Sequence, residues 1–124
     1  MLQIKDLSVS YYTDMGRAHA LNHVNLDLKR GEKLGLVGES GSGKSTMGLA
    51  MMRMIKPPGR IEGGEVIIEN QNLLSLSEKE MLNSRLSTIS YIPQGAMNSL
   101  NPVLKIKRQM VDAYNAHNNE RNIE

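Results

Sequence analysis

A glycine-rich run in the first half of the chain restricts the possible folds more than any other feature. Residues 38–45 read GESGSGKS and match the pattern G-x-x-x-x-G-K-[ST] at every fixed position. An apolar stretch, residues 34–37, precedes the run and predicts a buried strand, and residues with helical periodicity follow it. Strand, glycine-rich loop and helix in this order form a phosphate-binding P-loop, so the sequence predicts an α/β fold of the P-loop NTPase type.

The residue types in this run suit the binding of a nucleotide's phosphates. Glycine has no Cβ, so the backbone can curl until successive N–H groups point at one anion. Lys44 supplies a positive charge for the β- and γ-phosphates, Ser45 offers a hydroxyl to Mg²⁺, and Thr46 can add a hydroxyl contact. The predicted ligand is ATP with Mg²⁺, held by Gly38, Glu39, Ser40, Gly41, Ser42, Gly43, Lys44, Ser45 and Thr46. A glycine- and serine-rich run by itself is often only a flexible turn, but Lys-Ser-Thr at the fixed offset favours the phosphate site.

Apolar alternation predicts further strands on both sides of the loop. The strands are centred on Leu7, Val9 and Tyr11, on Val24, Leu26 and Leu28, on residues 66–68 and on residues 89–92. Residues 13–16 are predicted to form the turn between the first two strands.

Three helices are predicted from periodicity and capping. Met47, Ala50, Met51, Met54 and Ile55 share one face of a helix that residues 57–59, Pro-Pro-Gly, would end. Ser77 and Glu80 form a capping box at the start of a second helix, with Leu76 and Met81 placed as a hydrophobic staple. Ile106, Met110 and Tyr114 recur every four residues and predict a third, and the Asn-rich tail, residues 115–124, is expected to fray.

The composition limits the kinds of site that the chain can hold and the cellular location that is expected for it. The chain has no cysteine, which excludes disulfides, thiolate metal sites and a cysteine nucleophile. It has no apolar run of about 18 residues and no signal-peptide pattern at its start, so a cytoplasmic location is expected. The net charge of +2 does not argue for a nucleic-acid partner.

Residues 38–46 resemble the Walker A loop of the ATP-binding subunits of ABC transporters. The similarity extends to residues 20–32 and 64–66, and residues 91–94, Tyr-Ile-Pro-Gln, resemble the family's Q-loop. Residues 99–102, Ser-Leu-Asn-Pro, are similar to a tetrapeptide typical of the importers of oligopeptides, dipeptides and nickel. The resemblance covers most of the chain, from residue 2 to about residue 112.

The resemblance implies two site residues outside the loop. Tyr11 matches the aromatic residue that stacks on adenine, and the alternatives are that Tyr11 faces the core or that Tyr12 stacks instead. Gln94 matches the glutamine that touches Mg²⁺ or the attacking water and links the site to the membrane subunit, so the implied metal ligands are Ser45 and Gln94. Gly95 and Ala96 depart from the family's usual acidic-and-proline continuation.

The resemblance also implies an organisation, partners and a location. The chain would be the N-terminal part of an ABC ATP-binding domain, with an N-terminal antiparallel β subdomain and an incomplete P-loop core to about residue 94 and the start of a helical subdomain over residues 95–124. Its partners would be transmembrane permease subunits, a second ATP-binding subunit and, indirectly, a substrate-binding protein, but no nucleic acid. It would lie on the inner face of the cell membrane and power peptide import.

Several catalytic parts of the family have no counterpart in these residues. No run of four apolar residues after Leu76 ends in the aspartate that helps to hold Mg²⁺, and the signature stretch, the catalytic glutamate and the switch histidine are not found. No catalytic residue is therefore assigned, and the chain alone is expected to bind ATP without hydrolysing it. Two alternatives are a nucleotide-binding or interaction fragment without turnover and part of a soluble ABC protein that acts on nucleic acid.

Overall fold

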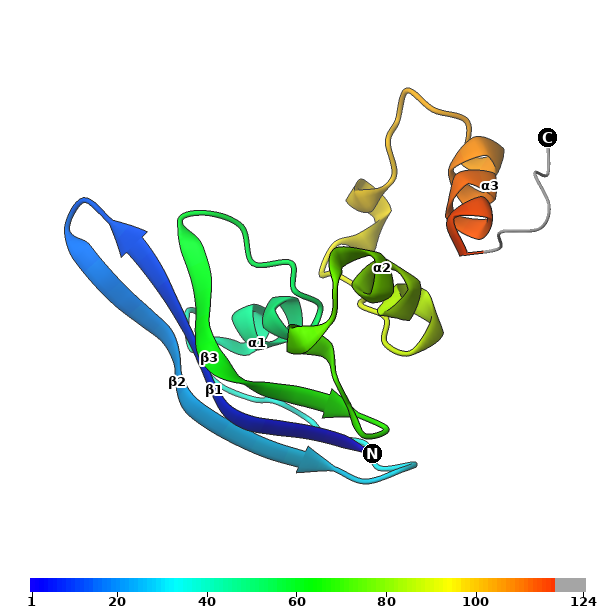
Figure 1. Cartoon of the computed structure of the whole chain (residues 1–124). Helices are drawn as coiled ribbons and strands as arrows, with labels where there is room; N and C mark the ends of the chain where they lie inside the picture. The colour runs from blue at the N-terminus through cyan, green and yellow to red at the C-terminus, as the bar shows by residue number, and fades with distance from the viewer. Residues whose placement is uncertain (118–124) are drawn as a thin grey trace. The chain divides into compact units, whose positions relative to one another are not determined.

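The computed structural model describes residues 1–117 and shows two compact units, which divide the chain after Ser90. The first unit, Met1–Ser90, contains an antiparallel sheet, the glycine-rich loop and two α-helices (Figure 1). The second unit begins at Tyr91 and contains one 3-10 turn and one α-helix among its described residues. Within residues 1–117, no helix has both the length and the apolar character needed to cross a bilayer.

The sheet of the first unit has four antiparallel strands in the order β2-β1-β3-β4. The strands are β1 Leu2–Thr13, β2 Gly16–Leu28, β3 Gly59–Ile68 and β4 Gln71–Asn72. The strands predicted from alternation in the first 28 residues and at residues 66–68 are confirmed, as is the turn at residues 13–16.

One face of the sheet carries the core. The buried cluster contains Ile4, Leu7, Val9, Leu21 and Val66 from the strands, with Met47, Ala50, Leu73 and Met81 from the helices and the turn beside β4. Methionine occupies two of these positions because the chain has no Phe or Trp to fill them.

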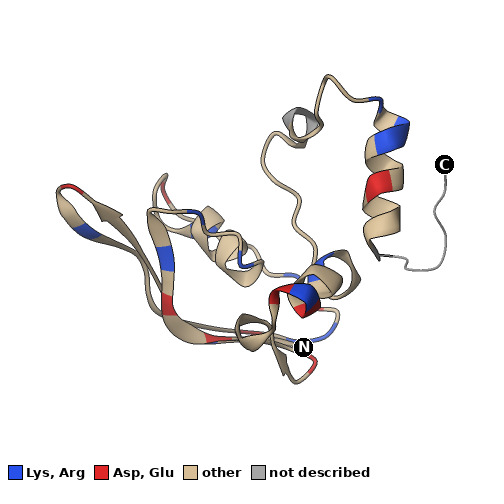
Figure 2. Cartoon of the chain, turned by 45° about the horizontal axis from the view of Figure 1, so that its top comes forward, with Lys and Arg blue, Asp and Glu red and all other residues tan. Residues whose placement is uncertain are grey.

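The helices are α1 Lys44–Met51, α2 Glu78–Ser87 and α3 Ile106–His117, with 3-10 turns η1 Leu73–Ser75 and η2 Ala96–Ser99. The capping box is confirmed: the Glu80 N–H donates to the Ser77 hydroxyl at 3.3 Å, and the Ser77 N–H donates to Glu80 Oε2 at 2.8 Å. Acidic residues lie in the first turn of α2 (red in Figure 2), and their negative charges interact favourably with the positive end of the helix dipole. The third helix is confirmed as well and includes residues 115–117, whereas the rest of the tail that was predicted to fray lies outside the described residues.

The prediction of a buried strand at residues 34–37 is wrong. These residues belong to no strand, and Leu34, Leu36 and Val37 are 48%, 46% and 94% exposed. A short apolar strand depends on neighbouring strands for its hydrogen bonds and on covering helices for its burial. Within the described residues, no strand pairs with this segment.

Two other predictions are corrected. Residues 89–92 form no strand, and only Ile89 makes an isolated bridge, to Arg85. The helix expected to reach Ile55 ends at Met51, because Arg53 takes a φ of 50° and turns the chain out of the helix. Pro57 therefore lies well beyond the end of α1 and does not end it.

Candidate functional site

The glycine-rich loop curls tightly before α1. Gly41 and Gly43 have φ angles of 82° and 92°, in the left-handed region that residues with a Cβ rarely adopt. The Ser42 N–H donates to the Glu39 oxygen at 3.2 Å and closes the loop upon itself. The positive φ angles of these two glycines thus let the backbone turn within a few residues.

Lys44 holds this loop together through its ammonium group. Lys44 Nζ donates to the main-chain oxygens of Gly38 at 2.8 Å and Glu39 at 2.6 Å, and to the Ser42 hydroxyl at 3.0 Å. An ammonium group has three N–H donors, so all three are directed at the loop. The positive charge therefore lies inside the curl, where an anion bound by the loop would meet it.

The start of α1 adds further donors. Gly43 is the N-cap residue and offers no side chain to cap the helix, and no acidic residue occupies the first turn. The Met47 N–H is bonded to the Gly43 oxygen at 2.9 Å, so the helical ladder starts here. The N–H groups of the preceding residues and the positive end of the helix dipole suit an anion such as phosphate. Ser45 and Thr46 lie in this first turn, and Ser45 is exposed.

Strand β2 packs directly against the glycine-rich loop at Gly43. A Cβ on Gly43 would lie 2.6 Å from the Ala20 main-chain oxygen and 3.0 Å from Leu21 Cδ2, so only glycine fits between the loop and the strand. Ala20 and Leu21 were not predicted as part of the site, because they act through a main-chain atom and a core side chain some 20 residues away in sequence. An open hollow of about 220 Å³ adjoins the loop, lined by Leu21, Val24, Leu36, Val37, Ser42, Gly43, Lys44 and Met47.

Tyr11 lies in β1, close to the strand segment that supports the loop. Val9 pairs with Leu21 and Tyr11 pairs with Ala18, so Tyr11 is two residues, or about 7 Å, along the strand from the pair next to Gly43. Its ring is partly buried and packs beside Gly59, where a Cβ would come within 2.7 Å of Tyr11 Cε1.

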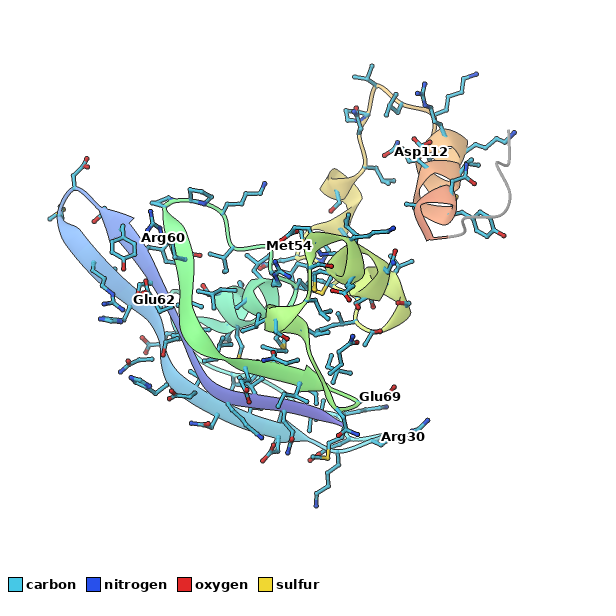
Figure 3. The ribbon with its side chains drawn as sticks, in the orientation of Figure 1. Arg30, Met54, Arg60, Glu62, Glu69 and Asp112 are labelled. Carbon is cyan, nitrogen blue, oxygen red and sulfur yellow. The ribbon has the colours of Figure 1, made fainter. Side chains whose placement is uncertain are left out.

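Tyr12 belongs to a different set of contacts. Its hydroxyl donates to Glu62 Oε1 at 2.8 Å, and the guanidinium groups of Arg60 and Arg17 lie 5.3 and 5.9 Å from the centre of its ring. Arg60 and Glu62 are both residues of β3 (labelled in Figure 3). The hydrogen bond to Glu62, then loss of hydration and the negative charge of Glu62, raise the pKa of Tyr12 above its ordinary value. Tyr12 is thus engaged by charged neighbours, whereas Tyr11 packs against the core.

Gln94 lies in the second unit, in an exposed turn just before η2. The structure therefore brings residues 38–46 together in one site within the first unit, with Tyr11 in the strand beside the segment that supports them. Gln94 belongs to the other unit.

The donor set of the loop fits a nucleotide's phosphates with Mg²⁺. Backbone N–H groups, the Lys44 ammonium and the hydroxyl groups of Ser45 and Thr46 are donor types that suit phosphate oxygens, and the Ser45 hydroxyl is a ligand type that suits a hard cation. A Cβ on Gly38 would lie 2.7 Å from Ser42 Oγ, so a side chain there would displace the Ser42 hydroxyl. Within residues 1–117, no group of three or more His, Cys, Asp or Glu side chains is arranged to hold a metal ion.

Comparison with known proteins identifies the family of the chain. Residues 21–124 match the family model described as ABC transporter. The chain is 44% identical over 118 residues to the oligopeptide transport ATP-binding protein OppD of Bacillus subtilis, and 37% identical over 118 residues to the dipeptide transport ATP-binding protein DppD of Lactococcus lactis. These alignments cover 94% and 95% of this chain but 33% and 34% of the relatives, so the chain spans about a third of their length.

A solved structure shares the fold. The dimeric post-hydrolysis state of the ATP-binding cassette MJ0796 bound to ADP and Pi has a TM-score of 0.59 and 34% sequence identity, over 67% of this chain and 34% of that chain. The antiparallel sheet and the loop before α1 agree with the predicted fold class, an incomplete ABC-type P-loop core with an N-terminal β subdomain. The chain therefore belongs to the ABC transporter family.

Proposed function

We propose that this chain binds ATP with Mg²⁺ in the loop of residues 38–46. The observation that carries the proposal is the position of the Lys44 ammonium, which lies inside a glycine curl at the uncapped start of α1. A phosphate chain could then use both this positive charge and the first N–H groups of α1.

Binding needs only a small exchange of hydrogen bonds. Of the three oxygens that Lys44 contacts, the Ser42 hydroxyl is the most distant, at 3.0 Å, and is the one most easily replaced by a β- or γ-phosphate oxygen. The remaining contacts to Gly38 and Glu39 would keep the loop closed around the phosphates. Ser45, exposed in the first turn of α1, would offer its hydroxyl to Mg²⁺, and the bound ion would neutralise phosphate charge.

The names of the relatives support a role in peptide import. Proteins described as oligopeptide and dipeptide transport ATP-binding proteins share 35–44% identity with almost the whole of this chain. We therefore infer that the complete domain powers peptide import together with transmembrane permease subunits and a second ATP-binding subunit, on the inner face of the membrane. A substrate-binding protein would deliver the peptide to the permease.

The segment from Gln94 to Asn101 is the proposed contact with the permease. It ends at a residue that is hydrogen-bonded to α3: Gln109 Nε2 donates to the Asn101 oxygen at 3.0 Å, and the Asn101 N–H donates to Gln109 Oε1 at 2.9 Å. Leu100 next to this residue is 49% exposed, which leaves an apolar side chain available to a partner. Cross-linking from Ser99 into a co-expressed permease tests this contact, and crosslinks confined to other parts of the chain would contradict it.

Calorimetric titration with ATP and Mg²⁺ tests the binding proposal. Lys44→Ala should weaken ATP by about tenfold or more, because a charge-assisted contact to phosphate contributes roughly 1.5–3 kcal/mol. Lys56→Ala, which removes an exposed lysine outside the loop, serves as the matched control and should leave the affinity unchanged. Equal affinities of the wild type and Lys44→Ala would overturn the assignment.

Turnover is a separate question from binding. The chain alone is expected to release no phosphate from ATP, since phosphoryl transfer depends on positioned groups beyond the phosphate loop. Phosphate release by the purified chain, with Lys44→Ala as the blank, measures this. Steady release that Lys44→Ala abolishes would contradict the expectation.

A further inference from the structure

Two arginines cross in opposite directions between α1 and α2. Arg53, just beyond α1, donates to the Leu76 oxygen at 2.6 Å and pairs with Glu78 at the start of α2. Arg85, near the end of α2, donates to the Met52 oxygen through Nε at 3.2 Å and through a terminal nitrogen at 3.0 Å. The same terminal nitrogen of Arg85 lies 3.3 Å from the Arg53 oxygen. The guanidinium group of Arg85, a residue of α2, is thus hydrogen-bonded to the carboxyl end of the helix that follows the P-loop.

Arg85 occupies the place where α2 breaks. Its φ and ψ of −64° and 134° are extended, and Leu86 follows with φ 74° and ψ −41°. A non-glycine residue with positive φ is strained, and this combination is near that of the rare γ-turn. The Leu86 side chain is 69% exposed, so burial of that side chain does not hold the backbone in this conformation.

Main-chain hydrogen bonds close the chain around the break. Leu86 N–H donates to the Ile89 oxygen at 2.8 Å, and the N–H groups of Thr88 and Ile89 donate to the Ser84 oxygen at 2.9 and 3.2 Å. We call residues 84–89 the strained turn. Arg85 therefore joins two features: its side chain holds the end of α1, and its main chain is part of the strained turn.

Helix α1 connects the P-loop to the carbonyl groups that Arg85 binds. The helix has eight residues and is about 12 Å long, with the P-loop at its amino end and Met52 as its C-cap residue. It has no basic residue in its last turn, so the Arg85 guanidinium supplies positive charge at its carboxyl end. A short helix moves as a rigid body, and a shift at the P-loop will move the carbonyl groups that Arg85 holds.

We propose that Arg85 is a positioning residue that couples nucleotide binding at the P-loop to the strained turn. A phosphate oxygen that replaces the Ser42 hydroxyl at the Lys44 ammonium shifts the amino end of α1. Arg85 then follows the carbonyl groups of Met52 and Arg53, and the strained turn responds. Gln94 follows this turn by five residues in the chain, so the coupling would reach the segment that carries it. The inference rests on the proposed binding of ATP. Arg53 is not expected to act in this way, because its side chain reaches α2 before the break.

Hydrogen exchange with and without ATP and Mg²⁺ tests the coupling. In the wild type, exchange at the amides of Leu86, Thr88 and Ile89 should change by at least about threefold when ATP binds. Arg85→Lys removes the two-nitrogen grip on Met52, because lysine presents a single ammonium group. This variant should bind ATP within about threefold of the wild type and lose the change in exchange. Arg53→Lys, the matched control between the same two helices, should keep it.

A second variant tests the coupling without a change at Arg85. Leu86→Gly relaxes the turn and leaves the arginine in place, so exchange at Thr88 and Ile89 should no longer depend on ATP. An ATP-dependent change that persists in Arg85→Lys or in Leu86→Gly overturns the inference, and so does an equal loss in both lysine variants. Wild-type protein that binds ATP with no change at the turn overturns the inference alone. A wild type that binds no ATP overturns the proposed function and the inference with it.

Discussion

Gly64 lies so close to the main chain of Leu7 that a Cβ on Gly64 would be 2.6 Å from the Leu7 Cα. The three long strands are irregular at this level: Asp6, His23 and Gly64 have φ angles of 54°, 51° and 102°. The pairing register of β1 shifts here against both of its neighbours. Bulges of this kind bend a sheet, and the bend is visible in Figure 1.

Gly64→Ala is therefore expected to destabilise the first unit by about 2 kcal/mol or more, since positive φ costs roughly 1–2 kcal/mol and the atoms that the methyl group would meet are main-chain atoms. The neighbouring Gly63 is the matched control, because a Cβ there meets nothing within 4 Å. Urea denaturation of the two variants measures the difference. If Gly63→Ala lost as much stability as Gly64→Ala, the close approach to Leu7 would not be the cause.

Local signals in the sequence predicted most of the fold of the first unit. The capping box at Ser77 and Glu80 and the turn at residues 13–16 depend only on residues a few positions apart, so a single sequence contains all that determines them. The long strands were readable because one of their faces packs in the core and the other does not. The bulges were not predicted. Asp and His are enriched among residues with positive φ, but residue type alone does not locate a bulge, which depends on the register between strands.

Two of the predictions that were wrong concern segments whose structure depends on distant partners. Residues 34–37 and 89–92 have the apolar character of strands, but a strand also needs a neighbour, and the described part of the chain provides none. The phosphate loop was predictable for the opposite reason, because its motif is contiguous. Ala20 and Arg85 were not predicted, because each contacts a residue far away in sequence through a main-chain oxygen. The Ala20 oxygen lies against Gly43. The Met52 oxygen accepts a hydrogen bond from Arg85.

Leu86 provides a direct test of strain in the α2 break. Leu86→Gly should be more stable than Leu86→Ala by about 1 kcal/mol, because glycine accepts a positive φ and alanine does not. Both variants lose the same exposed side chain beyond Cβ, so the comparison isolates the backbone. Thermal denaturation of the pair is the measurement, and equal stabilities would mean that the backbone at Leu86 is not strained.

The capping box makes the free energy of unfolding depend on pH in the acidic range. Hydrogen bonds from the Ser77 side chain and then from its main chain lower the pKa of Glu80 below its ordinary value of 4.5. A carboxyl group with a lowered pKa in the folded state contributes stability that is fully present above its unfolded value. That contribution is lost as the pH falls through the folded value.

Glu80→Gln keeps an oxygen that can accept from Ser77 but does not titrate in this range. The advantage of the wild type over this variant should therefore be constant from neutral pH to about pH 5 and shrink at lower pH. Denaturant midpoints of both proteins across this range measure it. An advantage that did not change with pH would show that the charge of Glu80 contributes nothing to the cap.

Tyr11 is predicted to stack on the adenine of ATP. It lies two residues along β1 from the pair that supports Gly43, whereas Tyr12 is held by Glu62 and the two arginines beside it. Stacking on a base contributes about 1–3 kcal/mol, so Tyr11→Leu should weaken ATP by roughly five- to a hundredfold. Tyr11→Phe keeps the ring and should bind ATP as the wild type does, which would show that the ring and not the hydroxyl group is needed. Tyr12→Leu should have little effect in the same titration, and a larger loss in Tyr12→Leu than in Tyr11→Leu would assign the stacking to Tyr12.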